Sequence, residues 1–186
     1  MLIKSLRIFP WFVVVLLVMS CSNKKNVKSD ADDLYQFKKI DLRNYDIPGT
    51  LYIPDETAGI GASFKTTIDH QEDFKWTISA GPNFELFIED WGDHSKRLEE
   101  FKTKLKQSDV FTSTIIEEHK NYLLYKRELT NPIEVKEYKH ISYHVYALIP
   151  IEGVYYEIRN KAQGDPLKTA QLMITSIKSF NPCPTK

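Results

Sequence analysis

The sequence contains only two cysteines, Cys21 and Cys183, among its 186 residues. Two cysteines cannot build the disulfide framework that supports many small exported domains, so the fold has to rest on its hydrophobic core. The chain also lacks an excess of one charge, because 25 basic residues balance 25 acidic ones. This balance excludes the basic footprint of a nucleic-acid-binding protein, and we expect no nucleic acid among the partners.

Histidines are few and widely spaced. Of the five, only His140 and His144 are close in sequence. In a strand, a spacing of four residues separates them by about 13 Å, which is too far for one shared metal ion. We therefore expect no metal site, and no motif in the sequence suggests another cofactor.

One cluster of acidic and histidine residues surrounds Trp91 and Gly92. Asp90, Asp93 and His94 lie where a predicted strand passes into a predicted helix. Acids near a helix N-terminus are favoured by capping and by the helix dipole, which is the simpler interpretation. The alternative that stays open is a small hydrolase or transferase that uses these three residues.

The first twenty residues differ from the rest of the chain. Lys4 and Arg7 precede an uncharged run at 8–19. At about 1.5 Å per residue the run spans about 18 Å, well short of a hydrocarbon core of roughly 30 Å. The pattern is typical of a signal peptide, which we assign to residues 1–20.

The four residues Val18-Met19-Ser20-Cys21 resemble the lipobox of bacterial lipoproteins. The resemblance implies that the Cys21 thiol receives diacylglycerol, that the chain is cut before Cys21, and that the new amine is acylated, for example with palmitate. Two or three acyl chains anchor a protein stably, so we expect Cys21 to hold the chain in a membrane. Ser22, where the family has Asp for inner-membrane retention, favours the outer membrane of a Gram-negative cell envelope.

Three segments follow the signal peptide. Residues 21–36 are polar and are predicted to be a flexible tether. Residues 37–181 are long enough for a single domain. Residues 182–186 form a tail in which Pro182 and Pro184 are expected to prevent regular structure.

If Cys21 carries lipid, Cys183 has no partner within the chain. We therefore expect a free thiol at Cys183, with pairing between molecules as the alternative.

Alternation with period two and helical spacing define the elements of the domain. Alternation predicts strands at 40–45, 50–53, 62–69, 74–80, 84–90, 110–118, 121–129, 139–149 and 154–160. Helical spacing predicts one helix from Asp93 to about Gln107, and a second that begins with Asp165 as N-cap and Pro166 as first residue.

The segment 141–149 is apolar on both faces, which indicates a central strand covered on both sides. We therefore predict an α+β fold, a mostly antiparallel β-sheet of hairpins with two amphipathic helices packed on it in α/β/α-like layers.

The order of these elements resembles a known family. An early turn at Ile47-Pro48-Gly49, the hairpins, and a final helix that ends in residues 174–180 (ITSIKSF) are similar to the PsbP-like group, which includes DcrB-type lipoproteins. The resemblance covers most of 38–180. It implies a layered α/β/α domain that is generally not an enzyme and that binds, or helps to assemble, membrane complexes.

Tyrosines gather in the second half of the domain. Tyrosine is enriched in interfaces, although cross-strand aromatic pairs also stabilise sheets without any binding role. Tyr146 and Tyr155 are our candidates for a binding patch.

The leading hypothesis for the function is a lipid-anchored binding or assembly module with an envelope protein as partner. An enzyme that uses Asp90, Asp93 and His94, and a carrier of an apolar ligand between sheet and helix, remain alternatives.

Overall fold

The computed structural model describes residues 34–61, 65–130 and 140–183. The predicted signal peptide, Cys21 and most of the predicted tether lie outside the described residues. So do residues 62–64 at the start of one predicted strand, and 139 at the start of another.

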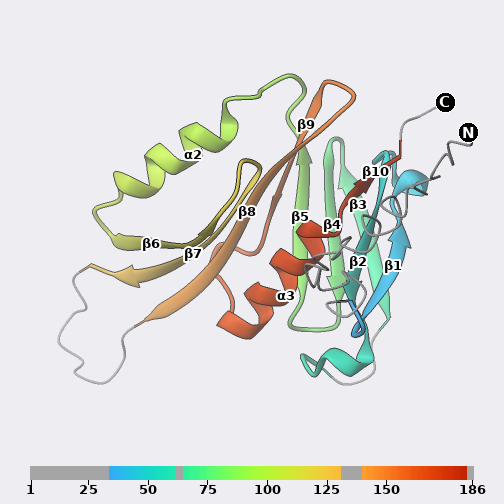
Figure 1. Cartoon of the computed structure of the whole chain (residues 1–186), viewed down its shortest axis with the longest axis horizontal. Coiled ribbons are helices and arrows are strands. Elements are labelled where there is room, and N and C mark those ends of the chain that lie inside the picture. The colour runs from blue at the N-terminus through green and yellow to red at the C-terminus, as the bar shows by residue number, and fades with distance from the viewer. Residues whose placement is uncertain (1–33, 62–64, 131–139, 184–186) are drawn as a thin grey trace, which may run out of the picture.

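The main sheet has seven strands, each antiparallel to its neighbours (Figure 1). In spatial order they are β3 (Thr66–Glu72), β4 (Lys75–Ala80), β5 (Glu85–Asp90), β9 (Val154–Arg159), β8 (Ile141–Ile151), β7 (Tyr122–Leu129) and β6 (Phe111–Glu118). The smaller sheet contains β1 (Phe37–Asp41), β2 (Gly49–Pro54) and β10 (Asn181–Pro182), with β2 in the middle. The predicted antiparallel sheet of hairpins is confirmed.

One long connection sets the topology of the main sheet. After β5 the chain passes through helix α2 (Arg97–Lys106) to β6 at the far edge. It then returns strand by strand through β7 and β8 to β9, which pairs with β5. Residues distant in sequence therefore become neighbours, as with Phe87 and Arg159.

Strand β8 separates two hydrophobic clusters. Val145 and Ala147 belong to a large cluster that also contains residues of β2, β4, β5 and helix α3 (Leu167–Lys178). Tyr146 and Leu148 point to the opposite face, where they join Leu98 and Leu105 of α2 in a second cluster. The prediction of a central strand covered on both sides is confirmed, and so is the α+β fold.

Helix α3 follows the predicted apolar stripe. Ala170, Met173, Ile174 and Ile177 are buried at helical spacing, and the helix packs on β2 and β8. The predicted start is wrong by one residue, because Pro166 occupies the N-cap position and its φ of −59° and ψ of 150° are not helical. Asp165 does not cap the helix: its carboxylate accepts a hydrogen bond from Asn160 Nδ2 at 2.7 Å.

Several other boundaries differ from the predicted ones. The predicted first strand at 40–45 is β1 at Phe37–Asp41, and Arg43–Tyr45 forms a 3-10 turn instead. Helix α2 begins at Arg97, because residues from Trp91 to Ser95 form turns whose hydrogen bonds span two or three residues. The last residues of the predicted tether belong to the domain, since Gln36 bonds through its amide to the Thr57 carbonyl at 2.8 Å.

Residues 181–183 are more regular than predicted, while 184–186 of the predicted tail lie outside the described residues. Asn181 and Pro182 pair with Thr50 and Gly49 of β2, and the Cys183 N–H donates to the Pro48 carbonyl at 3.0 Å. A proline is compatible with this position because β10 lies at the edge of its sheet.

Met173 provides a test of the large cluster. Its side chain is fully buried between α3 and the two sheets, so Met173→Ala should lower the free energy of unfolding by about 2–5 kcal/mol. The measurement is urea denaturation followed by circular dichroism. Gln171→Ala, on the exposed side of the same helix, should change stability by no more than about 0.5 kcal/mol. An equal effect of both substitutions would contradict this packing.

Candidate functional site

The predicted cluster of Asp90, Asp93 and His94 lies in the turn between β5 and α2, where its side chains make local contacts. Asp90 Oδ1 accepts a hydrogen bond from the Gly92 N–H at 2.7 Å, which stabilises the turn after β5. His94 Nε2 lies 3.1 Å from Glu100 Oε1 of α2, and this contact lowers the pKa of Glu100. Within the described residues, no hydrogen bond joins the side chains of Asp90, Asp93 and His94. The geometry thus gives these residues turn and helix-end contacts and does not assemble an acid–base site.

A buried carboxylate lies beneath helix α2. Glu157 of β9 receives three contacts: Arg97 Nε of α2 at 2.8 Å, Arg159 Nε at 3.4 Å, and the Tyr146 hydroxyl at 2.6 Å. The Arg97 guanidinium also lies 3.4 Å from the centroid of the Trp91 ring. Because a buried charge without partners is very unfavourable, these contacts hold the start of α2 against the sheet.

The expected surface position of Tyr146 is wrong. Tyr146 is only 2% exposed, and its ring stacks on Phe101 of α2 with centroids 3.8 Å apart. Burial and the hydrogen bond to Glu157 raise the pKa of its hydroxyl, which stays protonated. Tyr155 is half-buried at the border of the same cluster. Both tyrosines therefore support α2, and neither belongs to an open patch.

A serine–histidine pair lies where β8 meets the loop before α3. Ser142 Oγ is 2.9 Å from His144 Nε2, and both residues are buried. Gly164 covers the pair, because a Cβ added at this glycine would lie 2.6 Å from His144 Nε2. The glycine has a φ of +77°, so both its backbone and its missing side chain are required here. Gly164 therefore packs directly on the serine–histidine pair, at the wall of a depression that Ser142 also lines.

His144 is buried in a setting that disfavours its charged form. Its ring stacks on Tyr125, with ring centroids 5.1 Å apart. Burial, assisted by the positive charge of Arg127, lowers the pKa of His144 to about 4. Burial likewise raises the pKa of Tyr125 to about 12. Both rings are therefore neutral near neutral pH, and the pair packs as a small aromatic stack.

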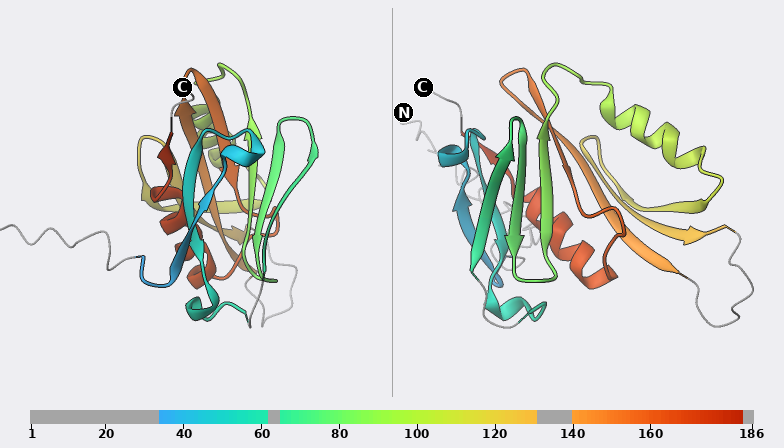
Figure 2. Two further views of the ribbon diagram at one scale, coloured as in Figure 1. Left: turned by 90° about the vertical axis from the view of Figure 1, so that its right-hand side faces the viewer. Right: turned by 180° about the vertical axis from the view of Figure 1, so that it is seen from behind.

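The sheet leaves one part of its surface uncovered. The β1–β2 sheet and α3 cover one face, and α2 covers the part of the other face formed by β6, β7, β8 and the first half of β9. Seen from behind, β3, β4 and β5 lie in the foreground without a described helix over them (Figure 2). We call this surface, which carries Lys75, Thr77, Phe87 and Glu89, the open face.

The open face contains a depression of about 250 Å³. It is lined by Asp69, Glu72, Lys75, Trp76, Thr77, Phe87, Ile88, Glu89 and Arg159. Lys75 Nζ lies 2.7 Å from Glu72, whose pKa this ammonium lowers. The Arg159 guanidinium lies 5.7 Å from the centroid of the Phe87 ring. An aromatic ring among charges of both signs suits a polar macromolecular partner better than an apolar ligand.

The space that an apolar ligand would need between sheet and helix is filled. Large side chains from both sheets and from α3 are completely buried there, among them Leu51, Ile78 and Ile177. In the described part of the chain, the interior therefore resembles a solid core, which does not favour the carrier hypothesis.

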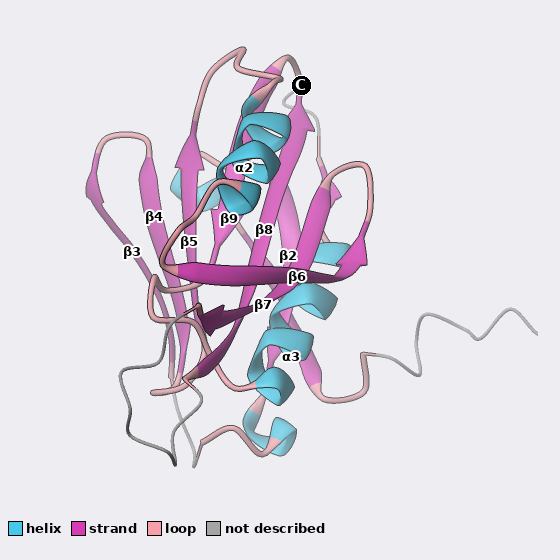
Figure 3. Ribbon diagram, turned by 90° about the vertical axis from the view of Figure 1, so that its left-hand side faces the viewer, coloured by secondary structure: helices cyan, strands magenta, loops and turns pink. Residues whose placement is uncertain are grey.

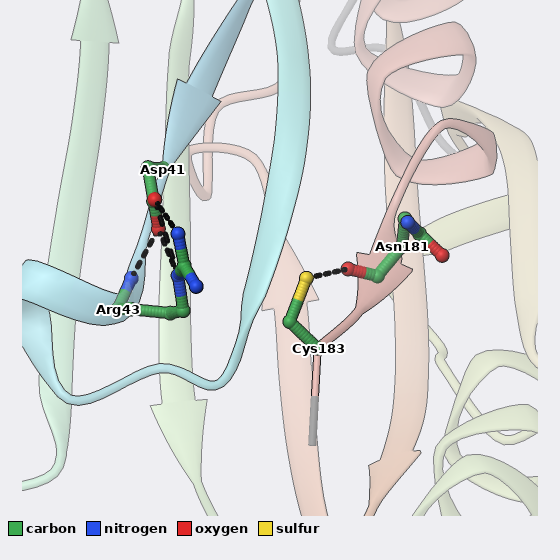
Figure 4. A network of polar contacts seen from close by, with 4 residues as sticks. All are labelled: Asp41, Arg43, Asn181 and Cys183. Atoms are coloured by element: carbon green, nitrogen blue, oxygen red, sulfur yellow. Dashed lines mark hydrogen bonds and ion pairs between the residues drawn. The ribbon is translucent and has the colours of Figure 1, made fainter. Parts of the chain in front are cut away.

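Charged and thiol groups lie at one end of the smaller sheet, beside its two edge strands β1 and β10. Arg43 forms an ion pair with Asp41 and lowers the pKa of that carboxyl to about 2 (Figure 4). Cys183 is a free thiol of intermediate exposure, and its S–H points to the Asn181 carbonyl at 3.8 Å. These contacts fix the local turn and the C-terminal strand.

Sequence reasoning missed the open face and the buried Glu157. The open face combines β3, β4 and β5 with β9, which follows more than sixty residues later in the chain. The alternation in 154–160 placed Glu157 on one face of a strand, but nothing local showed that α2 covers that face.

Comparison with known proteins leaves the chain without an assigned relative: no family model, no curated protein and no solved structure matches it. Two searches of the described residues were also negative. None of the described helices is long and apolar enough to cross a membrane. No group of three or more potential metal ligands was found among the same residues.

The depressed pKa of His144 predicts a pH-dependent stability. In the unfolded chain the ring binds a proton near its ordinary pKa of 6.5, whereas in the folded domain it does so only near about 4. As the pH falls from about 6.5 towards 4, protonation of His144 therefore stabilises the unfolded chain and lowers the free energy of unfolding. Between about pH 7 and pH 5 this residue alone should remove about 2 kcal/mol from the free energy of unfolding.

Urea denaturation at several pH values measures this loss. His144→Gln should lack it, while His140→Gln, at an exposed position, should keep the wild-type pH dependence. If His144→Gln loses stability between pH 7 and pH 5 as steeply as the wild type, the assigned role of burial is wrong.

Proposed function

We propose that this chain is a lipid-anchored lipoprotein of the bacterial cell envelope, and that its domain is a non-catalytic binding or assembly module. The proposed lipid anchor rests on the sequence Val18-Met19-Ser20-Cys21, which follows an uncharged run. A cysteine thiolate is the strongest nucleophile that a chain offers to a lipid donor. Ser22 supports delivery to the outer membrane.

The positions of the polar side chains in the domain support the proposed binding role. Glu157, His144 and Asp165 are each buried and each engaged in contacts that hold elements together. By contrast, the open face leaves the charged side chain of Lys75 exposed, beside the half-buried ring of Phe87, on strands of the main sheet. Rigid strands are good supports for a binding surface because their side chains keep fixed positions. We therefore assign partner binding to the open face, with an envelope protein as partner.

The anchor is tested by replacing the lipid-accepting thiol. Cys21→Ser should abolish incorporation of labelled palmitate, leave the uncleaved precursor, and change the distribution between membrane and aqueous fractions. Cys183→Ser is the matched control, and it should leave labelling and cleavage unchanged. Continued labelling of the Cys21→Ser protein would show that the lipid is attached elsewhere or that the lipobox assignment is wrong.

The open face is tested by local photocrosslinking in membranes. A photoreactive amino acid at Thr77 should give a discrete crosslinked product, because this side chain lies in the depression of the open face. The same amino acid at Gln171, exposed on α3, is the control and should give none. Absence of a product from Thr77, or equal products from both positions, would contradict the assignment of the binding surface.

A further inference from the structure

Strand β6 forms a free edge of the main sheet. Among the strands of the described residues it pairs with β7 alone, and the order of strands ends with it. Seen from the side, β6 crosses the front of the molecule, with no other described element in front of it (Figure 3). An edge of this kind presents unpaired backbone groups that can extend the sheet with another strand.

The pairing with β7 determines which backbone groups face outward. The Thr130 N–H donates to the Val110 carbonyl at 3.0 Å, and the register continues with Phe111 opposite Leu129. In an antiparallel pair the hydrogen-bonded positions alternate with positions whose N–H and C=O point away from the partner. Phe111, Ser113 and Ile115 therefore turn their backbone groups outward. The Phe111 N–H donates to Ser108 Oγ at 3.2 Å, a contact that a paired strand would replace.

The edge lacks most of the devices that keep sheets apart. Residues 110–116 (VFTSTII) contain no charge, no proline and no glycine. Val110, Ile115 and Ile116 are 59%, 38% and 49% exposed. Natural edge strands are usually protected by lysine, proline or a bulge. Here only the register shift between Ile115 and Glu117 interrupts the edge, and it leaves 111–115 regular.

We propose that β6 pairs with β6 of a second copy of this chain, antiparallel and across a twofold axis at Ser113. This register follows from the outward-facing positions, because Phe111, Ser113 and Ile115 must meet the same positions of the copy. Phe111 then lies opposite Ile115 of the copy on one face, and Thr112 lies opposite Thr114 on the other. Aromatic–aliphatic and threonine–threonine pairs are favourable across strands, so the segment is complementary to itself.

Charged residues flank the uncharged segment at both of its ends. Asp109 precedes β6, and Glu117 and Glu118 end it. Lys178 Nζ lies 2.7 Å from Glu117 and Lys102 Nζ lies 2.9 Å from Glu118. Antiparallel pairing brings Asp109 of one copy to the end of the other where these lysines lie. Lys102 Nζ also lies 2.8 Å from Glu99, so the acidic start of each strand meets a cluster in which two lysines are shared among three carboxylates, and the uncharged segment lies between.

Charges introduced at two exposed threonines test whether the partner is a second copy of the chain. In the proposed register Thr112→Lys/Thr114→Lys places lysine opposite lysine at two symmetric positions, and association should weaken at least about tenfold. Thr112→Glu/Thr114→Glu should weaken it as much. An equal mixture of the two variants should recover the wild-type dimer, because each lysine then faces a glutamate. The mass of the full chain in detergent solution, followed over a concentration series by light scattering, gives the dimer fraction.

Two controls separate the result from misfolding and from general charge effects. Recovery in the mixture shows that both variants are folded. Thr103→Lys/Gln107→Lys adds the same charge to the exposed side of α2 and should leave association unchanged. A wild-type chain that stays monomeric at all concentrations would overturn the proposal. So would weakening by both charge variants without recovery in the mixture, because the threonines of the two copies would then not face each other.

The register has its own test in a Cys183→Ser background. Thr112→Cys mixed with Thr114→Cys should give disulfide-linked dimers on oxidation, because these two positions face each other. Either variant alone should link far less, since each cysteine then faces a threonine of the copy. Efficient linking by one variant alone would show that the copies meet in another register.

Discussion

The fold depends on the burial of β8 on both of its faces. Val145 and Ala147 need one apolar layer, while Tyr146 and Leu148 need another on the opposite side. No single layer satisfies both, so the strand has to lie inside the sheet with a helix on each side. Helix α3 and the smaller sheet supply the first layer, and α2 supplies the second. The remaining strands are arranged around this requirement.

The two layers are held by different interactions. The layer under α3 is almost entirely apolar and fully buried, with Met173 and Ile177 at its centre. The layer under α2 is small and depends on a buried charge as well as on aromatic stacking. Apolar packing is stabilising without precise orientation, whereas Glu157 is tolerated only with Arg97 and Tyr146 in place. The position of α2 is therefore more specific than its modest contact area suggests.

Most elements could be predicted from the sequence because their faces differ so clearly. The alternation in 74–90 gave the β4–β5 hairpin, and the stripe through Ala170 and Ile174 gave α3. Boundaries failed where a side chain found a tertiary partner. Asp165 is a good N-cap residue in isolation, but Asn160 and Lys161 bind its carboxylate in the fold. Tyr146 appeared suited to a surface because the sequence did not show that Phe101 would cover it.

The pairing of β2 with both β1 and β10 has a consequence for how the chain is made. Synthesis proceeds from the N-terminus, and β2 receives its second neighbour only when Asn181 and Pro182 emerge, more than 120 residues after β2. Strand β5 also waits for β9, about seventy residues later. Neither sheet is complete in a nascent chain, so a half-made molecule exposes unpaired strands on both.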